Sequence, residues 1–297
     1  MLTGLHYTAN YTQERYDFLK QNGIEGYEKR VYVDSVGIPT IGVGINLQVS
    51  SNLNAVLLAL GFDVNSTTLS GTALTAEQDY IRQIRNTVAI TYAKNDSVTV
   101  QTVLDRILQN RAADTRYSQS FSRRSVFQFN NDTESKNAFD AIIPRYENRL
   151  DSKLGYTMAN SKERIALLSL SYNSKTGATD LLGDNLIAAI KNDNRAEAWY
   201  EIRYNSNKNG IHANRRYEES YIFGLYDNIP TFTEAEAKEV MRMYTFHRDV
   251  IESYETKYSP TAAGYVDILA NTNYARNYLI TSFAGDIGVN IDGEVLV

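Results

Sequence analysis

Cysteine is absent from this chain of 297 residues, and histidine occurs only three times. Without cysteine there can be no disulfide framework, no thiolate metal site and no cysteine nucleophile. His6, His212 and His247 are far apart and fall on different predicted elements, so we expect no histidine-based metal site. The sequence also lacks the Gly-x-Ser-x-Gly segment of a serine hydrolase and the lysine of a phosphate-binding loop. We therefore expect a function that needs neither a bound metal nor a cofactor.

A basic charge excess and a long apolar run are also missing. The formal net charge is −5 and the pI is about 5.4, so nothing predicts a nucleic-acid partner. The longest apolar run, residues 55–62, is far too short to cross a bilayer. The first residues have neither the basic region nor the apolar core of a secretory signal peptide. We expect no membrane span and no signal peptide.

What is present is the composition of a globular protein, with 43% hydrophobic and 22% charged residues, which is enough for a sizeable core. Apolar periodicity predicts helices at residues 11–22, 51–62, 72–94, 98–110, 133–150, 161–172, 181–190, 195–204, 214–226, 233–254 and 265–283. Ser161 is a predicted N-cap, and capping boxes are predicted to begin at Thr75 and Thr233.

One small β element is predicted near the N-terminus. Residues 30–34 and 38–43 alternate in polarity or are rich in β-branched side chains, and residues 35–37 form a turn between them. The tail at residues 285–297 alternates as well, as an edge strand or an adhesive tail does. We predict a mainly α fold of the α+β type, with a small N-terminal β lobe.

The segment before and within this hairpin carries the candidate chemistry. Glu25 ends a predicted helix, Asp34 follows the first strand, and Thr40 lies on the returning strand before Gly42 and Gly44. Two carboxyl groups and a hydroxyl that holds a water are the groups needed to cleave a glycosidic bond. A lone acidic residue is, however, most often a solvated surface charge.

The order and spacing of these residues resemble the catalytic signature of phage lysozymes of the T4 type. In that family a Glu, an Asp and a Thr fall at the same spacings of nine and six residues. Residues 164–177 resemble the family's buried central helix, and residues 214–223 resemble its C-terminal helix with two consecutive arginines. Many family members carry His after the Gly-x-Gly turn, where this chain has Ile45 and Asn46.

The resemblance implies a lysozyme-like fold and a muramidase, a glycosidase that hydrolyses the β-1,4 bond between N-acetylmuramic acid and N-acetylglucosamine. The substrate would be the glycan strands of peptidoglycan, and the reaction would be inverting. Glu25 would be the general acid. Asp34 would orient or activate the attacking water and stabilise positive charge on the sugar, and Thr40 would position that water.

We further predict that Asn173, Arg215 and Tyr32 bind substrate. Arg215 corresponds to an arginine near the catalytic Glu in the family, but it could equally form an ordinary helix ion pair with Glu219, four residues on. Asn173 could line the cleft or cap a turn in the core. A tyrosine such as Tyr32 can stack its ring on a sugar face while its hydroxyl makes a hydrogen bond.

The resemblance leaves two parts of the chain unmatched. We predict a lysozyme-like catalytic domain at residues 1–228, with a helical insertion at about 65–155, and a C-terminal helical extension at residues 229–297 that could bind a phage structural protein. The alternative function is a structural or binding component of a virion or secretion apparatus that keeps the lysozyme fold. Made in the host cytoplasm without a signal peptide, the enzyme would reach the cell wall through a holin or within a virion.

Overall fold

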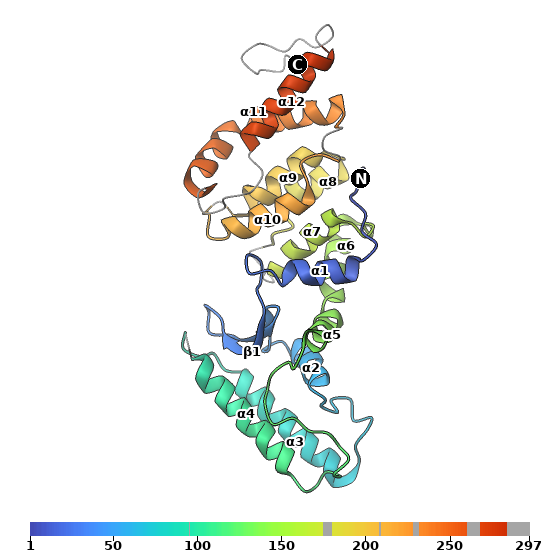
Figure 1. Cartoon of the computed structure of the whole chain (residues 1–297), viewed down its shortest axis with the longest axis vertical. Coiled ribbons are helices and arrows are strands. Elements are labelled where there is room, and N and C mark those ends of the chain that lie inside the picture. Colours follow the sequence, from blue (N-terminus) through green and yellow to red (C-terminus); the bar gives the residue numbers. More distant parts are fainter. Residues whose placement is uncertain (95, 175–179, 208, 228–231, 260–267, 284–297) are drawn as a thin grey trace. The chain divides into compact units, whose positions relative to one another are not determined.

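The structure is a computed structural model, and it describes the chain except residues 95, 175–179, 208, 228–231, 260–267 and 284–297 (Figure 1). The predicted edge strand at 285–297 lies outside the described residues. The fold is 61% helix and 6% strand, with one three-stranded antiparallel sheet, which confirms the mainly α prediction. None of the helices in the described part is both long and apolar enough to span a bilayer.

The chain divides into two compact units. One comprises residues 16–145, and the other comprises residues 1–15 together with 146–297. Helices α1 (Tyr11–Leu19) and α6 (Pro144–Leu154) each contribute residues to both units. The predicted boundary at residue 228 stays a prediction.

The sheet in the unit of residues 16–145 consists of β1 (Glu28–Val33), β2 (Pro39–Gly42) and β3 (Ile45–Asn46), in that order. One face is apolar because Val31, Val33, Ile41 and Ile45 are buried on it. The hairpin of β1 and β2 is confirmed. Strand β3 was not predicted, since a strand of two residues has no periodicity to detect.

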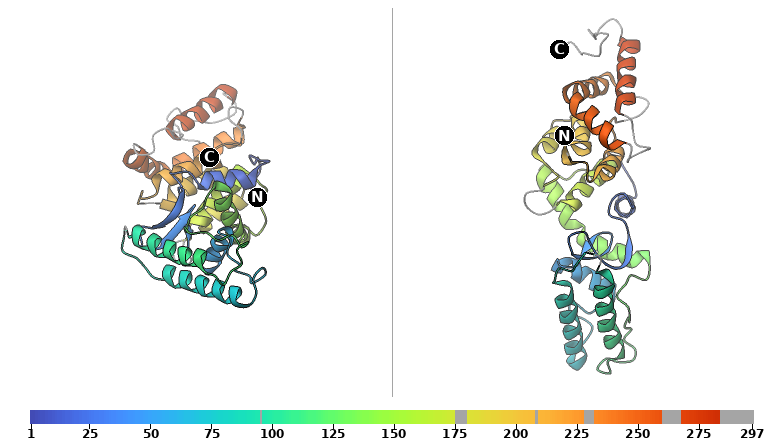
Figure 2. Two further views of the ribbon diagram at one scale, coloured as in Figure 1. Left: turned by 60° about the horizontal axis from the view of Figure 1, so that its bottom comes forward. Right: turned by 90° about the vertical axis from the view of Figure 1, so that its left-hand side faces the viewer.

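Four further helices complete this unit. Helix α2 (Ser50–Ala59) packs against α5 (Asp132–Ile142), and α3 (Gly71–Val88) lies beside α4 (Ser97–Ala113) (Figures 1 and 2). The helical character predicted for residues 133–150 is present, but it is divided between two helices, because Pro144 has no backbone N–H to continue α5 and begins α6 instead. The predicted cap at Thr75 is also wrong. Helix α3 begins at Gly71, and the Thr75 hydroxyl donates back to the Gly71 carbonyl oxygen.

A buried ion pair joins α3 to α4. The side chains of Arg111 and Glu77 are both fully buried and make two hydrogen bonds of 2.7 and 2.8 Å. The Tyr117 hydroxyl donates to Glu77 at 2.6 Å, and the Phe62 ring lies 3.9 Å from the Arg111 guanidinium carbon. Because removing one partner would leave an uncompensated buried charge, this pair holds the two helices at one register.

The other unit is helical. Its helices are α7 (Lys162–Asn173), α8 (Asp184–Lys191), α9 (Arg195–Arg203), the 3-10 helix η1 (Asn205–Asn207), α10 (Ala213–Phe223), α11 (Glu234–Tyr258) and α12 (Ile268–Phe283). The N-cap at Ser161 and the capping box at Thr233 are confirmed.

Helix α7 is buried on all sides, with residues 163–172 all buried. Helix α11, which belongs to the predicted C-terminal extension, shares the core of this unit. Its buried Val240, Ile251 and Tyr254 belong to the same cluster as Leu170 and Trp199. This helix is therefore part of the body of the unit rather than an appendage to it.

Replacing Glu77 with Gln should destabilise the protein by about 3–5 kcal/mol, because Arg111 would remain charged and buried without its counter-ion. The free energy of unfolding from urea titrations measures this. Asp79→Asn is the matched control on the same helix, because its partner Arg82 is exposed, and it should change stability by less than about 0.5 kcal/mol. Equal losses in the two variants would contradict the role given to the buried pair.

Candidate active site

The second face of the sheet is polar. Residues directly opposite each other in antiparallel strands project to the same face. Thr40 is opposite Tyr32 in β1 and opposite Asn46 in β3. Three side chains that can hydrogen-bond thus line one face, while the apolar side chains of the alternate positions fill the other. This division follows from the period of two in a strand.

Glu25 lies in the turn that follows α1 and is half-buried. Its backbone N–H donates to the Leu19 carbonyl oxygen at 3.2 Å. The carboxylate lies directly over Gly44, since a Cβ at that position would be 2.6 Å from Oε2. Gly44 also has φ +65°, a conformation that favours glycine. Only glycine at this position allows the turn after β2 to approach the carboxylate so closely.

Asp34 begins the turn between β1 and β2 and is half-buried. Its Oδ1 accepts hydrogen bonds from the backbone N–H groups of Val36 and Ile38, both at 2.9 Å. Its own N–H donates to the Ile38 carbonyl oxygen at 3.0 Å. The same side chain thus shapes the turn and is held by it. Oδ2 makes no hydrogen bond within the described part of the chain.

Thr40 is 4% exposed, in the middle of β2. Its hydroxyl donates to the Ile38 carbonyl oxygen at 3.1 Å. Because that bond occupies the proton, the oxygen can act only as an acceptor towards a further group. A water beside Thr40 would therefore donate to it.

The Tyr32 hydroxyl is close enough to Glu25 and Asp34 to feel the charge of both carboxylates. Burial raises the pKa of its hydroxyl, and the charges of Glu25, Asp34 and Glu28 raise it further. Glu25 and Asp34 therefore both act on the Tyr32 hydroxyl, which stays protonated and can donate a hydrogen bond at neutral pH. The structure brings Glu25, Tyr32, Asp34 and Thr40 together in one unit.

Asn46 was not predicted as a site residue. It was noted only as a departure from the family pattern, although its position opposite Thr40 puts its amide on the polar face. Its Oδ1 accepts from the Gln48 backbone N–H at 2.8 Å, which holds the side chain in one orientation. No local signal identifies Asn46, because a strand of two residues is too short to show alternation.

Asn173 and Arg215 lie in the other unit, where they belong to one buried ion network. The fully buried Glu219 pairs with Arg215 at 2.9 Å and with Arg216. Ser169 donates to Glu219 at 2.5 Å, and Arg216 donates to the Asn173 side-chain oxygen at 2.9 Å. The ion pair considered for Arg215 is present, and Asn173 is a partner of the same network.

The lowered pKa of Glu219 shows that this network favours the charged carboxylate. Burial alone would raise the pKa, but the guanidinium groups of Arg216 and Arg215 outweigh burial and lower it. A lowered pKa means that the folded state favours the charged form more than the unfolded state does. The network therefore stabilises the fold above the unfolded-state pKa of 4.5 and does so progressively less as the pH falls below it.

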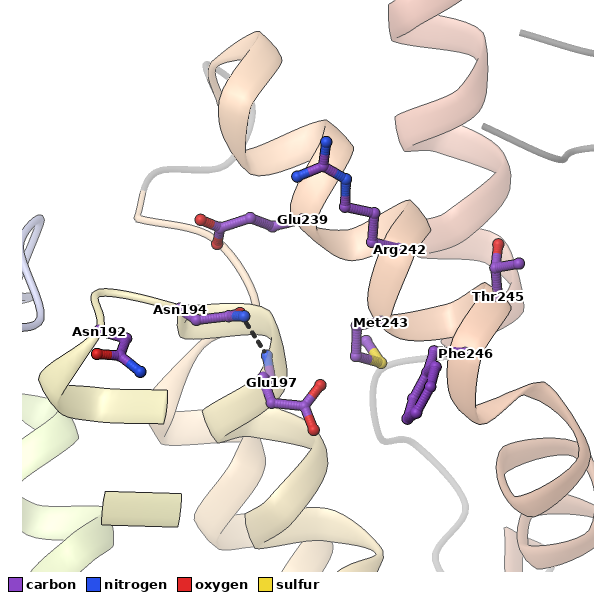
Figure 3. Close-up of a pocket in the computed structure, with 8 residues that line it drawn as sticks. All are labelled: Asn192, Asn194, Glu197, Glu239, Arg242, Met243, Thr245 and Phe246. Atoms are coloured by element: carbon purple, nitrogen blue, oxygen red, sulfur yellow. Dashed lines mark hydrogen bonds between the residues drawn. The ribbon is translucent and has the colours of Figure 1, made fainter. Parts of the chain in front are cut away.

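A separate pocket of about 560 Å³ lies between the start of α9 and the middle of α11 (Figure 3). Glu197 and Glu239 are its carboxylates, and the exposed ring of Phe246 stands at one side. The Glu197 carboxylate is hydrogen-bonded to His247 Nε2 at 2.9 Å. Burial raises the pKa of Glu239, as do nearby acidic groups. None of the predicted site residues lines this pocket.

Among the described residues, no three His, Cys, Asp or Glu side chains form a group that could hold a metal ion.

Comparisons of the chain with protein-family models, with curated proteins and with solved structures find no match. The candidate site is therefore judged on its own geometry. Its distinguishing feature is a pair of half-buried carboxyl groups and a buried hydroxyl, held by short-range backbone contacts around one small sheet.

Replacing Glu219 with Gln should cost about 3–5 kcal/mol of stability at neutral pH, because two buried guanidinium groups would lose their counter-ion. The wild type should also lose stability as the pH falls below about 4.5, and this component should be missing in the variant. Urea titrations at several pH values measure both effects. Asp79→Asn, at an exposed i,i+3 pair with Arg82, is the control and should leave the curve nearly unchanged. A similar pH profile in Glu219→Gln would contradict this account.

Proposed function

We propose that the chain is a muramidase with a lysozyme-like fold, which hydrolyses the β-1,4 bond between N-acetylmuramic acid and N-acetylglucosamine in peptidoglycan. The observation that supports this proposal is the position of Glu25. Its carboxyl group lies over Gly44, in the unit whose sheet carries Tyr32 and Thr40 on one face. Asp34 also shapes the turn between β1 and β2, but formation of that turn does not account for a second carboxyl group over Gly44. An inverting glycosidase uses two carboxyl groups, one as acid and one as base, and a hydroxyl beside them can hold the attacking water.

In this mechanism Glu25 donates its proton to the glycosidic oxygen as the bond to the anomeric carbon breaks. A water attacks the opposite face of that carbon and gives a proton to Asp34, so the configuration is inverted. Asp34 Oδ1 is engaged with two backbone N–H groups, which leaves Oδ2 to receive this proton. Thr40 accepts a hydrogen bond from the water, because its own proton is bound to the Ile38 carbonyl oxygen.

The Tyr32 hydroxyl contributes by donating a hydrogen bond to the sugar or to one of the carboxylates. Its raised pKa keeps it protonated over the range in which a carboxylic acid and a carboxylate can work together. Peptidoglycan lies outside the cytoplasm, so the enzyme reaches it through a holin or as part of a virion.

Glu25→Gln should lower the rate of peptidoglycan hydrolysis by about 10²–10⁴-fold or more, because the amide cannot protonate the leaving oxygen. The measurement is digestion of purified peptidoglycan with mass analysis of the released sugars. Glu28→Gln, an exposed residue three positions away, is the matched control and should retain full activity. Products ending in reducing muramic acid are expected, whereas anhydro-sugars would overturn the hydrolytic mechanism. No activity in the wild type would overturn the function itself.

Gly44→Ala should reduce the rate about 10²-fold, because the added methyl group would displace the Glu25 carboxyl group by an ångström or so. The substitution also forces alanine into a left-handed conformation, which costs about 1–2 kcal/mol. Gly61→Ala separates the two effects, because Gly61 has φ +81° but open space around its missing side chain. It should lose similar stability and keep full activity. Equal activity in the two alanine variants would contradict the placement of Glu25.

A further inference from the structure

Strand β1 has one edge that β2 does not cover. The Asp34 N–H lies on the edge of the chain that faces β2, because it donates to the carbonyl oxygen of Ile38, just before β2. Successive N–H groups of a strand point to opposite edges, so those of Val31 and Val33 point away from β2. Unpaired edge amides are costly when buried and are open to pairing with another chain when exposed. Among the described residues the sheet has no fourth strand, and beyond β2 strand β1 has one isolated antiparallel bridge, between Arg30 and Gln128.

Helix α4 supplies the missing acceptors. The Val33 N–H donates to Ser97 Oγ at 2.9 Å, and the Val31 N–H donates to Gln101 Oε1 at 2.8 Å. Four residues of helix rise about 6 Å, and two residues of strand rise about 6.6 Å. Side chains at i and i+4 of a helix therefore match the spacing of alternate amides on a strand edge.

One turn further along α4, Asp105 contacts the segment around Phe127 rather than a β1 amide. Asp105 accepts from the Phe127 N–H at 2.8 Å and from Gln101 Nε2 at 2.7 Å, while Gln101 Nε2 also donates to the Phe127 carbonyl oxygen at 3.1 Å. Phe129 N–H then donates to the Lys29 carbonyl oxygen at 3.0 Å. The Gln101 amide is thus held at both ends, and the edge of β1 is covered from residue 29 to residue 33.

The turn that follows β1 is held from the same side. Tyr92, in the connection between α3 and α4, donates its N–H to the Gly37 carbonyl oxygen at 2.9 Å. A Cβ at Gly37 would lie 2.5 Å from the Tyr92 carbonyl oxygen, so the two backbones are in close contact. The α3–α4 hairpin itself is stiffened by the buried Arg111–Glu77 pair. The hairpin is therefore held by Tyr92 at its connection and by the buried ion pair near its other end.

We propose that Ser97 and Gln101 are positioning residues for the hydrolysis, acting through β1 on Asp34 and Tyr32. Val33 is the residue next to Asp34, and Tyr32 lies between the two amides that α4 holds. The helical insertion thus acts as the missing strand of the sheet and fixes the carboxylate relative to Thr40. This inference rests on the proposed function and adds a role for the insertion within it.

A simpler role would be that α4 only covers the sheet edge. In that case, weakening the contacts would lower stability, but each folded molecule would work at its usual rate. A positioning role makes a different prediction, because a carboxylate displaced by less than an ångström slows the reaction without weakening substrate binding. The ratio of the changes in kcat and KM therefore distinguishes the two roles.

The test uses the full chain with Ser97→Ala, Ser97→Thr and Gln101→Ala. Thr102→Ala is the control on the same helix, since Thr102 is exposed and its hydroxyl donates to the Val98 carbonyl oxygen within that helix. We expect Ser97→Ala and Gln101→Ala each to lower kcat about tenfold on purified glycan strands, with KM within about twofold. Ser97→Thr keeps the acceptor oxygen and should restore kcat, and Thr102→Ala should change neither constant.

Amide hydrogen exchange, measured by NMR on the same variants, tests the inference without relying on activity. The N–H groups of Val36 and Ile38, which bind Asp34 Oδ1, should exchange about tenfold faster in Ser97→Ala and Gln101→Ala than in the wild type. Unchanged exchange, or an unchanged kcat per folded molecule, would overturn the positioning role. If the wild type released no sugar, the proposed function would fall, and the exchange rates would still decide whether α4 holds Asp34.

Discussion

The backbone amides of strand β1 are the constraint on which the candidate site depends. Each must find an acceptor, and alternate amides face opposite edges. On one edge of β1 the acceptors are carbonyl groups of β2, and this pairing brings Thr40 opposite Tyr32. On the other edge, the Val31 and Val33 N–H groups donate to side chains of α4. Because both edges are satisfied, a sheet too short to be stable alone holds a carboxylate, a hydroxyl and a phenol at fixed positions.

The helical unit of residues 1–15 and 146–297 is organised by charge as much as by apolar packing. Glu219 is buried between two arginines, and Glu163 is buried beside Arg195 and His6. Such groups cannot be buried alone, so each carboxylate requires its partners at one geometry. Arg215 and Asn173 are both held within the network around Glu219.

Much of the fold could be predicted from local patterns. Ser161 and Thr233 were identified as caps because a cap depends on the next three residues only. The same reasoning failed at Thr75, whose hydroxyl is bonded within the helix that had already begun at Gly71. Pro144 was overlooked as a helix break. For the candidate site, Glu25, Asp34, Thr40 and Tyr32 were predicted from the sequence, and their roles stay predictions. Asn46 was not among them, because it becomes a neighbour of Thr40 only through strand pairing.

The sequence alone determined which residues can carry chemistry, since carboxyl spacing, a hydroxyl and glycines are local properties of the chain. It also determined most helices, because apolar periodicity is local. Only the tertiary structure decided that Glu25 lies over Gly44 and that Ser97 and Gln101 hold β1. The residues joined by those contacts are separated by 19 positions in the case of Glu25 and Gly44 and by 70 positions in the case of Val31 and Gln101. No local pattern records them, because they depend on the packing of whole elements and on the need to satisfy every buried amide.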